Sequence, residues 1–242
     1  MMLEFINTDY AYHTLSGETE AVKGLSFSIV RGQFVSVIGP SGCGKTTILS
    51  LAAGLIAPTG GEVKRAEERC GYMLQRDALF PWRTVEANIF LPLEIRGERG
   101  GEARARAVEL AKKYGLGDFL KKKPGQLSGG MRQRAALIRT LAAGAELLLL
   151  DEPFSALDYQ TRLEVCDDVQ GIIKNERKTA LLVTHDISEA IALSDKVIVL
   201  SARPAHVVAE HDIPFGDGSP KSRRNSPEFA AMFETLRGEL GL

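Results

Sequence analysis

The chain has few cysteines and no long apolar segment, and both absences limit what it can be. Its three cysteines, Cys43, Cys70 and Cys166, form no C-x-x-C pair, which argues against a disulfide framework and a zinc site. No uninterrupted apolar run reaches the roughly 18 to 20 residues that a spanning helix needs. The first residues carry acids and no basic segment before an apolar stretch, so we expect no signal peptide. Any role at a membrane is therefore expected to be peripheral.

An excess of charge of one sign is also missing. The chain has 30 Lys and Arg against 31 Asp and Glu, which gives a formal net charge of -1. Nucleic-acid-binding proteins usually carry a basic excess that neutralises phosphates, so we expect no nucleic-acid partner. The 242 residues, with 44% hydrophobic and 25% charged side chains, can form an ordinary globular core without disulfides.

Strand-like and helix-like segments alternate along most of the chain. Alternating apolar residues in 3–5 and 25–29 predict two antiparallel strands separated by a loop around Gly17. Continuous apolar strands are expected at 34–38, 147–150, 180–183 and 197–200, and helices after Gly44, at 157–173 and at 188–193. Apolar strands that alternate with helices predict a mostly parallel sheet covered on both faces.

Two regions differ from this α/β pattern. From 76 to 144 the sequence predicts helices without strands, at 84–95, 102–114 and 131–143, and we interpret this region as a helical insertion. The last forty or so residues contain few strand signals and are expected to form a partly ordered tail.

A glycine-rich segment at 39–46 fits the phosphate-loop pattern G-x-x-x-x-G-K-[ST] between an expected strand and helix. It consists of Gly39, Pro40, Ser41, Gly42, Cys43, Gly44, Lys45 and Thr46, with Thr47 next in the helix. Such a loop turns backbone N–H groups toward a polyphosphate, and the helix N-terminus adds a positive dipole end. Lys45 is expected to reach the β- and γ-phosphates and Thr46 to bind Mg²⁺. The loop alone predicts a purine nucleotide triphosphatase or a kinase.

Cys43 lies inside this loop, and we interpret it as a spacer rather than a nucleophile. Its position at a helix N-terminus could lower its pKa.

Two adjacent acids follow four leucines at the end of an expected strand. In a nucleotide-binding sheet this edge presents carboxylates to the ligand. Asp151 is the expected Mg²⁺ partner, and Glu152 is then left to orient or deprotonate the attacking water.

Between these two sites the run 127–134, Leu-Ser-Gly-Gly-Met-Arg-Gln-Arg, resembles the signature of ABC ATPases. The expected helix at Met131 would give this run a second anion-binding N-terminus. Met131 stands where the family usually has Gln, so only Ser128, Gly129 and Gly130 are carried over as nucleotide contacts.

The resemblance extends to other positions and covers nearly the whole chain. It implies that Gln75 is the Q-loop residue that contacts Mg²⁺, that 155–158 with Asp158 is the D-loop, and that His185 is the catalytic switch histidine. Tyr12 resembles the aromatic residue that stacks on adenine, with Tyr10 as the alternative.

The family resemblance also implies a fold and an assembly. It implies one ABC ATPase domain over 1–242: a nucleotide-binding core of 1–75 and 145–205 with N-terminal antiparallel strands, a helical subdomain of 76–144 and a tail of 206–242. Two ATPase chains, identical or paired, would bind ATP and Mg²⁺ head to tail on the cytoplasmic face of the membrane. They would drive transmembrane permease subunits and, indirectly, a periplasmic or extracellular solute-binding protein.

The run 79–88 with 126–134, 156–158 and Arg203-Pro204 is similar to importers of the nitrate, sulfonate and taurine type. Its Phe80-Pro81-Trp82 patch would help to form a groove for a permease helix.

Two other classes of protein remain as alternatives. A soluble ABC-type ATPase acting on nucleic acid or ribosomes usually carries a long coiled coil or two cassettes, and the sequence has neither. A P-loop kinase or GTPase would not explain 127–134, Gln75 and His185 together.

Overall fold

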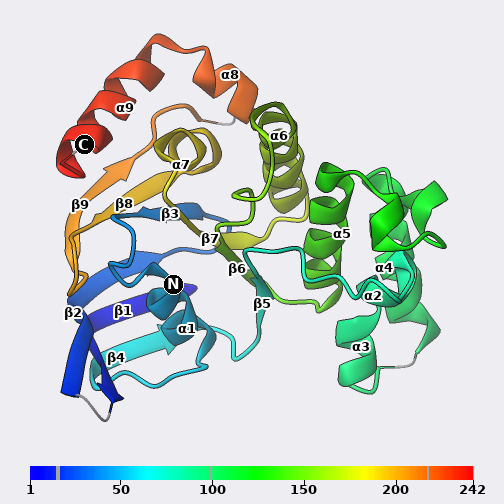
Figure 1. Cartoon of the computed structure of the whole chain (residues 1–242), viewed down its shortest axis with the longest axis horizontal. Coiled ribbons are helices and arrows are strands. Elements are labelled where there is room, and N and C mark those ends of the chain that lie inside the picture. The colour runs from blue at the N-terminus through cyan, green and yellow to red at the C-terminus, as the bar shows by residue number, and fades with distance from the viewer. Residues whose placement is uncertain (15–16, 99, 217, 242) are drawn as a thin grey trace.

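A six-stranded sheet forms the centre of the protein in a computed structural model that describes residues 1–14, 17–98, 100–216 and 218–241 (Figure 1). In spatial order its strands are β5 (Cys70–Met73), β6 (Leu147–Asp151), β7 (Thr179–Thr184), β3 (Phe34–Ile38), β8 (Lys196–Leu200) and β9 (Val207–Asp212). The first five are parallel and β9 is antiparallel to β8. The predicted, mostly parallel sheet is confirmed.

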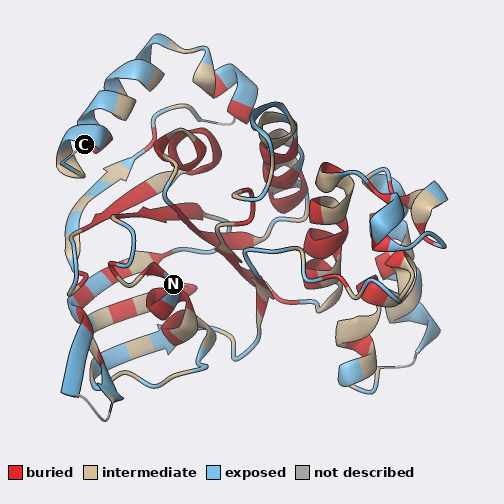
Figure 2. Ribbon diagram, viewed as in Figure 1, coloured by how far each residue is buried: buried red, intermediate tan, exposed pale blue. Residues whose placement is uncertain are grey.

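Helices and a second sheet bury both faces of this central sheet (Figure 2). Leu148 and Leu150 of β6 share one apolar cluster with α5 (Gly129–Ala142) and α6 (Tyr159–Asn175). Leu147 and Leu149 point the other way and share a cluster with α1 (Lys45–Ala53). Burial on both faces explains why the strand residues are continuously apolar rather than alternating.

The second sheet is antiparallel and has the order β2-β1-β4. Its strands are β1 (Leu3–Thr14), β2 (Gly17–Ile29) and β4 (Gly60–Arg65). The predicted pairing is confirmed, with Phe5 opposite Phe27 and their rings stacked at 4.6 Å between centroids. Strand β4 was not predicted, because its sequence is polar and none of its residues is fully buried.

The insertion between β5 and β6 is helical, as predicted, and lies to one side of the sheet (Figure 1). It contains α2 (Val85–Ile89), α3 (Leu91–Ile95), α4 (Gly101–Lys113), the short 3₁₀ helices η1 (Gly117–Phe119) and η2 (Pro124–Gln126), and α5. The single helix predicted over 84–95 is two helices divided at Phe90. Pro92 lacks a backbone N–H and lies in the first turn of α3, where none is needed.

The C-terminal segment is folded, so the expectation of a partly ordered tail is wrong. Strand β9, α8 (Pro220–Arg224) and α9 (Pro227–Glu239) cover α7 (Ile187–Leu193) and the β8 edge. Arg223 is only 1% exposed and donates to the carbonyls of Ser194 and Gly216, both at 2.6 Å. Because this guanidinium is buried on backbone oxygens, it anchors α8 to the core.

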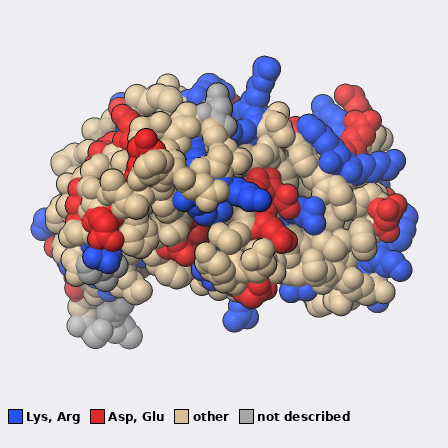
Figure 3. Space-filling model, turned by 90° about the horizontal axis from the view of Figure 1, so that it is seen from above, with Lys and Arg blue, Asp and Glu red and all other residues tan. Residues whose placement is uncertain are grey.

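Charges of both signs are interspersed on the face drawn in Figure 3. Several large apolar side chains are nevertheless exposed, including Trp82 and Ile95 of the insertion. Within the described ranges, no helix has both the length and the apolar character needed to cross a bilayer.

Candidate functional site

The predicted phosphate loop connects β3 to the first turn of α1. Two of its glycines are required by close contacts. A Cβ on Gly39 would lie 2.9 Å from Cys43 Sγ, and one on Gly44 would lie 2.8 Å from the Ala21 carbonyl oxygen. Gly44 also has φ of +128°, a conformation that other residues rarely adopt. The loop is therefore packed tightly between the central sheet and β2.

A cavity of about 280 Å³ opens over this loop. Its lining consists of Ser41, Gly42, Gly44, Lys45, Thr46, Thr47, Glu152 and Arg203. The Lys45 ammonium is buried and donates to the carbonyls of Gly39 and Pro40 at 2.8 and 2.9 Å. The cavity thus combines two cationic side chains with a loop of backbone amides, which suits a polyphosphate.

The Cys43 thiol is not activated, although it lies at the N-terminus of a helix, where its pKa could have been lowered. The residue is buried, and this burial raises the pKa of the thiol, although Lys45 and Arg203 act in the opposite direction. Desolvation therefore outweighs the nearby positive charges, and the interpretation of Cys43 as a spacer remains.

The carboxylates predicted after β6 lie beside the loop. The Tyr72 hydroxyl donates to Asp151 at 3.3 Å. Burial raises the pKa of Asp151, and hydrogen bonds from Tyr72 and Thr46 oppose this rise. Because its carboxyl lies next to the hydroxyl of Thr46, Asp151 offers an oxygen ligand for a cation held there.

Glu152 has a strained backbone and contacts the predicted switch histidine. Its φ is +43°, which is unusual for a residue with a side chain, and its N–H donates to the Val183 carbonyl at 2.9 Å. His185 follows β7, and its Nδ1 lies 3.0 Å from Glu152 Oε2. The structure therefore brings the candidate base and the candidate histidine together at the cavity.

Tyr12 lies at the edge of this site on β1. Its hydroxyl is 3.0 Å from Thr47 Oγ1, its ring packs edge-on against Tyr10, and 43% of the residue is exposed. An exposed ring next to the phosphate loop is suitably placed to stack on a base.

The remaining predicted residues do not line the cavity. Ser128 caps α5 by accepting from the Met131 N–H at 3.3 Å, and Gly129 and Gly130 form the first turn. A Cβ on Gly130 would lie 2.8 Å from Val165 Cγ2, so this turn packs directly on α6.

Asp158 and Gln75 also lie outside the cavity over the phosphate loop. Asp158 caps α6 by accepting from the Thr161 N–H, and this hydrogen bond lowers the pKa of its carboxyl. The Gln75 amide donates to Ser155 Oγ at 3.4 Å, between the two predicted loops. Neither residue reaches the phosphate cavity of its own chain.

No described group of three or more His, Cys, Asp and Glu side chains could hold a metal ion by itself. The donors near the cavity are instead Asp151 and Thr46. This set fits Mg²⁺, which takes one or two protein oxygens together with phosphate oxygens and water.

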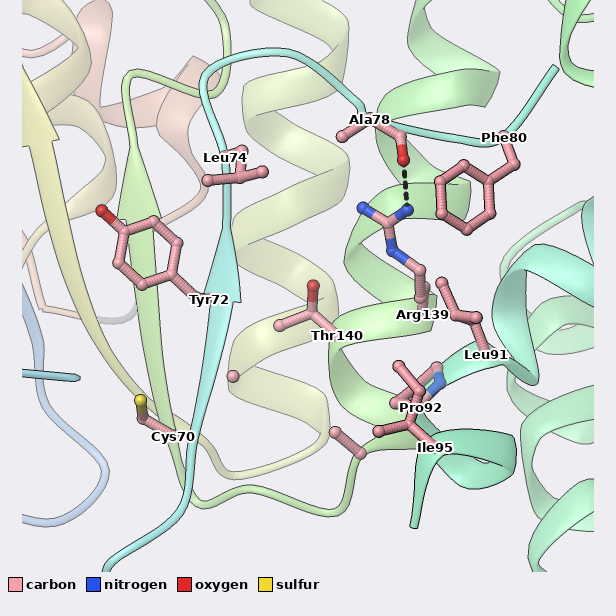
Figure 4. A pocket seen from close by; sticks show the side chains of 12 residues that line it. Cys70, Tyr72, Leu74, Ala78, Phe80, Leu91, Pro92, Ile95, Arg139 and Thr140 are labelled. Carbon is pink, nitrogen blue, oxygen red and sulfur yellow. Dashed lines mark hydrogen bonds between the residues drawn. The ribbon is translucent and has the colours of Figure 1, made fainter. Parts of the chain in front are cut away.

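A second cavity, of about 450 Å³, lies between β5 and the helical insertion (Figure 4). Its apolar wall contains Leu74, Phe80, Leu91, Pro92 and Ile95. Arg139 projects from α5 into this wall and donates to the carbonyls of Ala78 and Asp77 at 2.7 and 2.8 Å. Trp82 stacks on Phe80 with ring centroids 5.0 Å apart and is 69% exposed. We call this cavity the insertion groove.

Two contributors to the phosphate site, Tyr72 and Arg203, were not predicted from the sequence. Tyr72 lies in the unpredicted strand β5, which pairs with β6 and so places its hydroxyl near Asp151. Arg203 was noted only as part of a subfamily pattern, although it lines the cavity. No local sequence signal marks either role, because both depend on strand order.

Comparison with known proteins gives consistent matches. Residues 22–155 match the family described as ABC transporter. The "Uncharacterized ABC transporter ATP-binding protein YtlC" of Bacillus subtilis is 46% identical, over 98% of this chain and 96% of that protein. The "Taurine import ATP-binding protein TauB" of Jannaschia sp. is 37% identical, over 92% and 87%.

A solved structure also resembles this fold. It is the dimeric ATP-binding cassette MJ0796 in a post-hydrolysis state bound to ADP and Pi, with a TM-score of 0.73 and 31% identity. The match covers 88% of this chain and 99% of that one.

Proposed function

This chain belongs to the ABC transporter family of ATP-binding proteins, and we propose that it powers the import of a small anionic solute such as nitrate, a sulfonate or taurine. As a family member it binds ATP and couples ATP hydrolysis to transport. The observation that carries the assignment of the site is the cavity in which Lys45, Thr46 and Glu152 meet. The solute class is supported by 37% identity to a taurine import protein.

Within this proposal the phosphate loop holds the nucleotide. The amides of the loop and Lys45 bind the phosphates, and the exposed Tyr12 ring stacks on adenine. Thr46, Asp151 and Gln75 would hold Mg²⁺, which when bound neutralises phosphate charge. Gln75 would have to turn away from Ser155 to take part.

Glu152 acts as the base or the water-orienting group in this scheme. The 3.0 Å contact between Glu152 and His185 keeps the carboxylate at the end of β6, beside the phosphate loop. A carboxylate there accepts the proton of water as water attacks the terminal phosphate, and His185 contacts that phosphate.

A second ATPase chain completes the site. Ser128, Gly129, Gly130 and Asp158 lie outside the cavity of their own chain, so they could contact nucleotide only across an interface. The dimeric form of the related cassette supports this arrangement. The second chain is identical or a paired ATPase subunit, and ATP favours the closed dimer.

The insertion groove receives a helix of a transmembrane permease subunit. Its apolar wall and the exposed Trp82 are costly to leave in water, and an amphipathic helix would cover them. The chain therefore lies peripherally on the cytoplasmic face of the membrane, and a periplasmic or extracellular solute-binding protein acts through the permease.

Purification from native membranes in mild detergent tests this function. The chain should bring with it a permease and a solute-binding protein whose ligand can be titrated. Recovery of ribosomal or DNA-associated proteins without a membrane partner would instead favour a soluble ABC-type ATPase acting on nucleic acid or ribosomes.

A pair of variants tests the groove in the same experiment. Ile95→Glu places a charge in the insertion groove, and Val208→Glu places the same charge on exposed β9. Ile95→Glu should lose the permease while keeping ATP binding, and Val208→Glu should keep both. Loss of the permease from both variants would contradict the assignment of the groove.

A further inference from the structure

The loop 201–206, which connects β8 to β9, is closed on itself. The N–H of its first residue, Ser201, donates to the His206 carbonyl, and the Ser201 hydroxyl accepts from the His206 N–H, both at 3.0 Å. The Ser201 hydroxyl also lies 3.1 Å from the Pro204 carbonyl. These bonds fix the backbone on both sides of Arg203.

The same loop is bonded to the antiparallel sheet. The Ala205 N–H donates to the Ala21 carbonyl at 2.9 Å, and the Lys23 N–H donates to the Ala205 carbonyl at 3.0 Å. Ala21 is also the residue whose carbonyl packs against Gly44 of the phosphate loop. The loop 201–206 and the phosphate loop are thus held against the same segment of β2.

Arg203 spans the short distance between these two loops. Its Nη2 and Nε lie 2.7 and 3.1 Å from the Gly42 carbonyl oxygen. Gly42 has φ of +73°, and the next N–H, that of Cys43, donates to the Pro40 carbonyl at 3.3 Å. The peptide between Gly42 and Cys43 is therefore held from one side by Arg203 and from the other by the loop itself.

The guanidinium also brings charge to the cavity. Arg203 lines the cavity together with Lys45, so a second positive charge lies at the phosphate loop. A guanidinium has five N–H donors, and the bonds to Gly42 use its Nε and Nη2 edge. Arginine is well suited to phosphate because its planar fork stays charged and weakly hydrated.

From these contacts we infer that Arg203 is a further residue of the nucleotide site, which positions the phosphate loop through Gly42 and strengthens binding of the polyphosphate through its charge. This inference rests on the proposed role of the phosphate loop in binding ATP. Arg203 adds a second cationic side chain to Lys45 and the loop amides, from a position 161 residues after Gly42.

Binding of ATP, ADP and AMP to the full chain tests the inference. Arg203→Gln should raise the Kd for ATP about tenfold and the Kd for AMP much less, because AMP brings fewer charges to the loop. Arg203→Lys should recover part of the affinity, since it keeps the charge but loses the forked contact. The gap between wild type and Arg203→Gln should narrow as salt is raised, because salt screens an exposed charge.

Arg106→Gln is the matched control, because Arg106 is an exposed arginine on α4. It should bind all three nucleotides as wild type does. Thermal unfolding without nucleotide shows whether each variant is folded, and Arg203→Lys tests the charge if Arg203→Gln unfolds.

Two results would overturn the inference. One is an ATP affinity of folded Arg203→Gln equal to that of wild type; the other is an equal loss for ATP and AMP that does not depend on salt. If wild type itself bound no ATP, the proposed function would fail instead, so the two failures are distinguishable.

Discussion

A buried glutamate near His185, the proposed switch histidine, should make the stability of this protein depend on pH. Glu189 lies on α7 and is 4% exposed. The Thr184 hydroxyl donates to its carboxyl at 2.7 Å, and Arg162 Nε lies 3.7 Å from the same group. Burial is the largest effect and raises the pKa of Glu189 to about 7 from its usual 4.5.

The other groups around Glu189 shift its pKa in opposite directions, so their effects partly cancel. The Thr184 hydrogen bond, Arg162 and His185 lower the pKa of Glu189, whereas Asp186 raises it. Burial raises the pKa of the Cys166 thiol on α6, and the Glu189 charge adds to this rise. The effect of desolvation on the pKa of Glu189 therefore outweighs the combined effect of the Thr184 hydrogen bond, Arg162 and His185.

The sign of the pH dependence follows from this raised pKa. The folded protein keeps a proton on Glu189 between pH 4.5 and about 7, where the unfolded chain has released it. The contribution of Glu189 to folding stability is therefore fully present below pH 4.5 and is lost as the pH rises to about 7. A rise from 4.5 to about 7 corresponds to about 3 kcal/mol of lost stability at pH 8.

Glu189→Gln removes this titration while keeping the size of the side chain. We expect the free energy of unfolding of the variant, minus that of wild type, to increase by about 3 kcal/mol between pH 4.5 and pH 8. Urea unfolding at several pH values measures this difference. Glu102→Gln is the control for the loss of one negative charge, because the Glu102 carboxylate is exposed to solvent. A difference that stays constant from pH 5 to pH 8 would refute the reasoning.

Three further predictions concern the site and the core. Glu152→Gln should keep ATP affinity and lose about a hundredfold or more in turnover, since the carboxylate acts in the transition state; wild-type turnover would break the assignment. Thiol labelling of Cys43 should be slower at pH 7 than that of free cysteine and should accelerate with pH, because burial raises its pKa. Gly71→Ala should lower the free energy of unfolding by about 1–3 kcal/mol, since the new Cβ would lie 2.5 Å from Thr140 Cγ2. Gly125→Ala, which would meet nothing within 4 Å, should leave urea unfolding nearly unchanged.

The sequence was most informative where the structural requirement is local. Glycines at 39 and 44 are required by contacts within a few ångströms of the phosphate loop, and the loop pattern records that requirement directly. The apolar strands β3, β6 and β7 were predictable because both of their faces are buried, so their residues form continuous runs.

The sequence was least informative where polar residues depend on distant partners. Arg223 lies in the expected partly ordered tail, yet it is buried because the carbonyls of Ser194 and Gly216 accept its hydrogen bonds. Strand β9 alternates between exposed and half-buried residues, and its pairing with β8 alone gives it a place in the sheet. Neither partner can be identified from the local pattern, which is why the tail was expected to be only partly ordered.

The strand order explains how residues far apart in the sequence form one site. In the order β5-β6-β7-β3-β8-β9, the phosphate loop leaves β3 between His185, which follows β7, and the loop with Arg203, which follows β8. Glu152 follows β6, the other neighbour of β7, so it meets His185 at the same edge of the sheet.

The same order connects the phosphate site to the insertion groove. β5 pairs with β6 along Cys70–Met73, and the chain that leaves β5 continues through Leu74 and Phe80 of the groove wall. The Tyr72 hydroxyl of β5 also donates to Asp151 at the end of β6. Tyr72 also lines the groove, so one side chain contacts both sites, and the two sites share adjacent strands of one sheet.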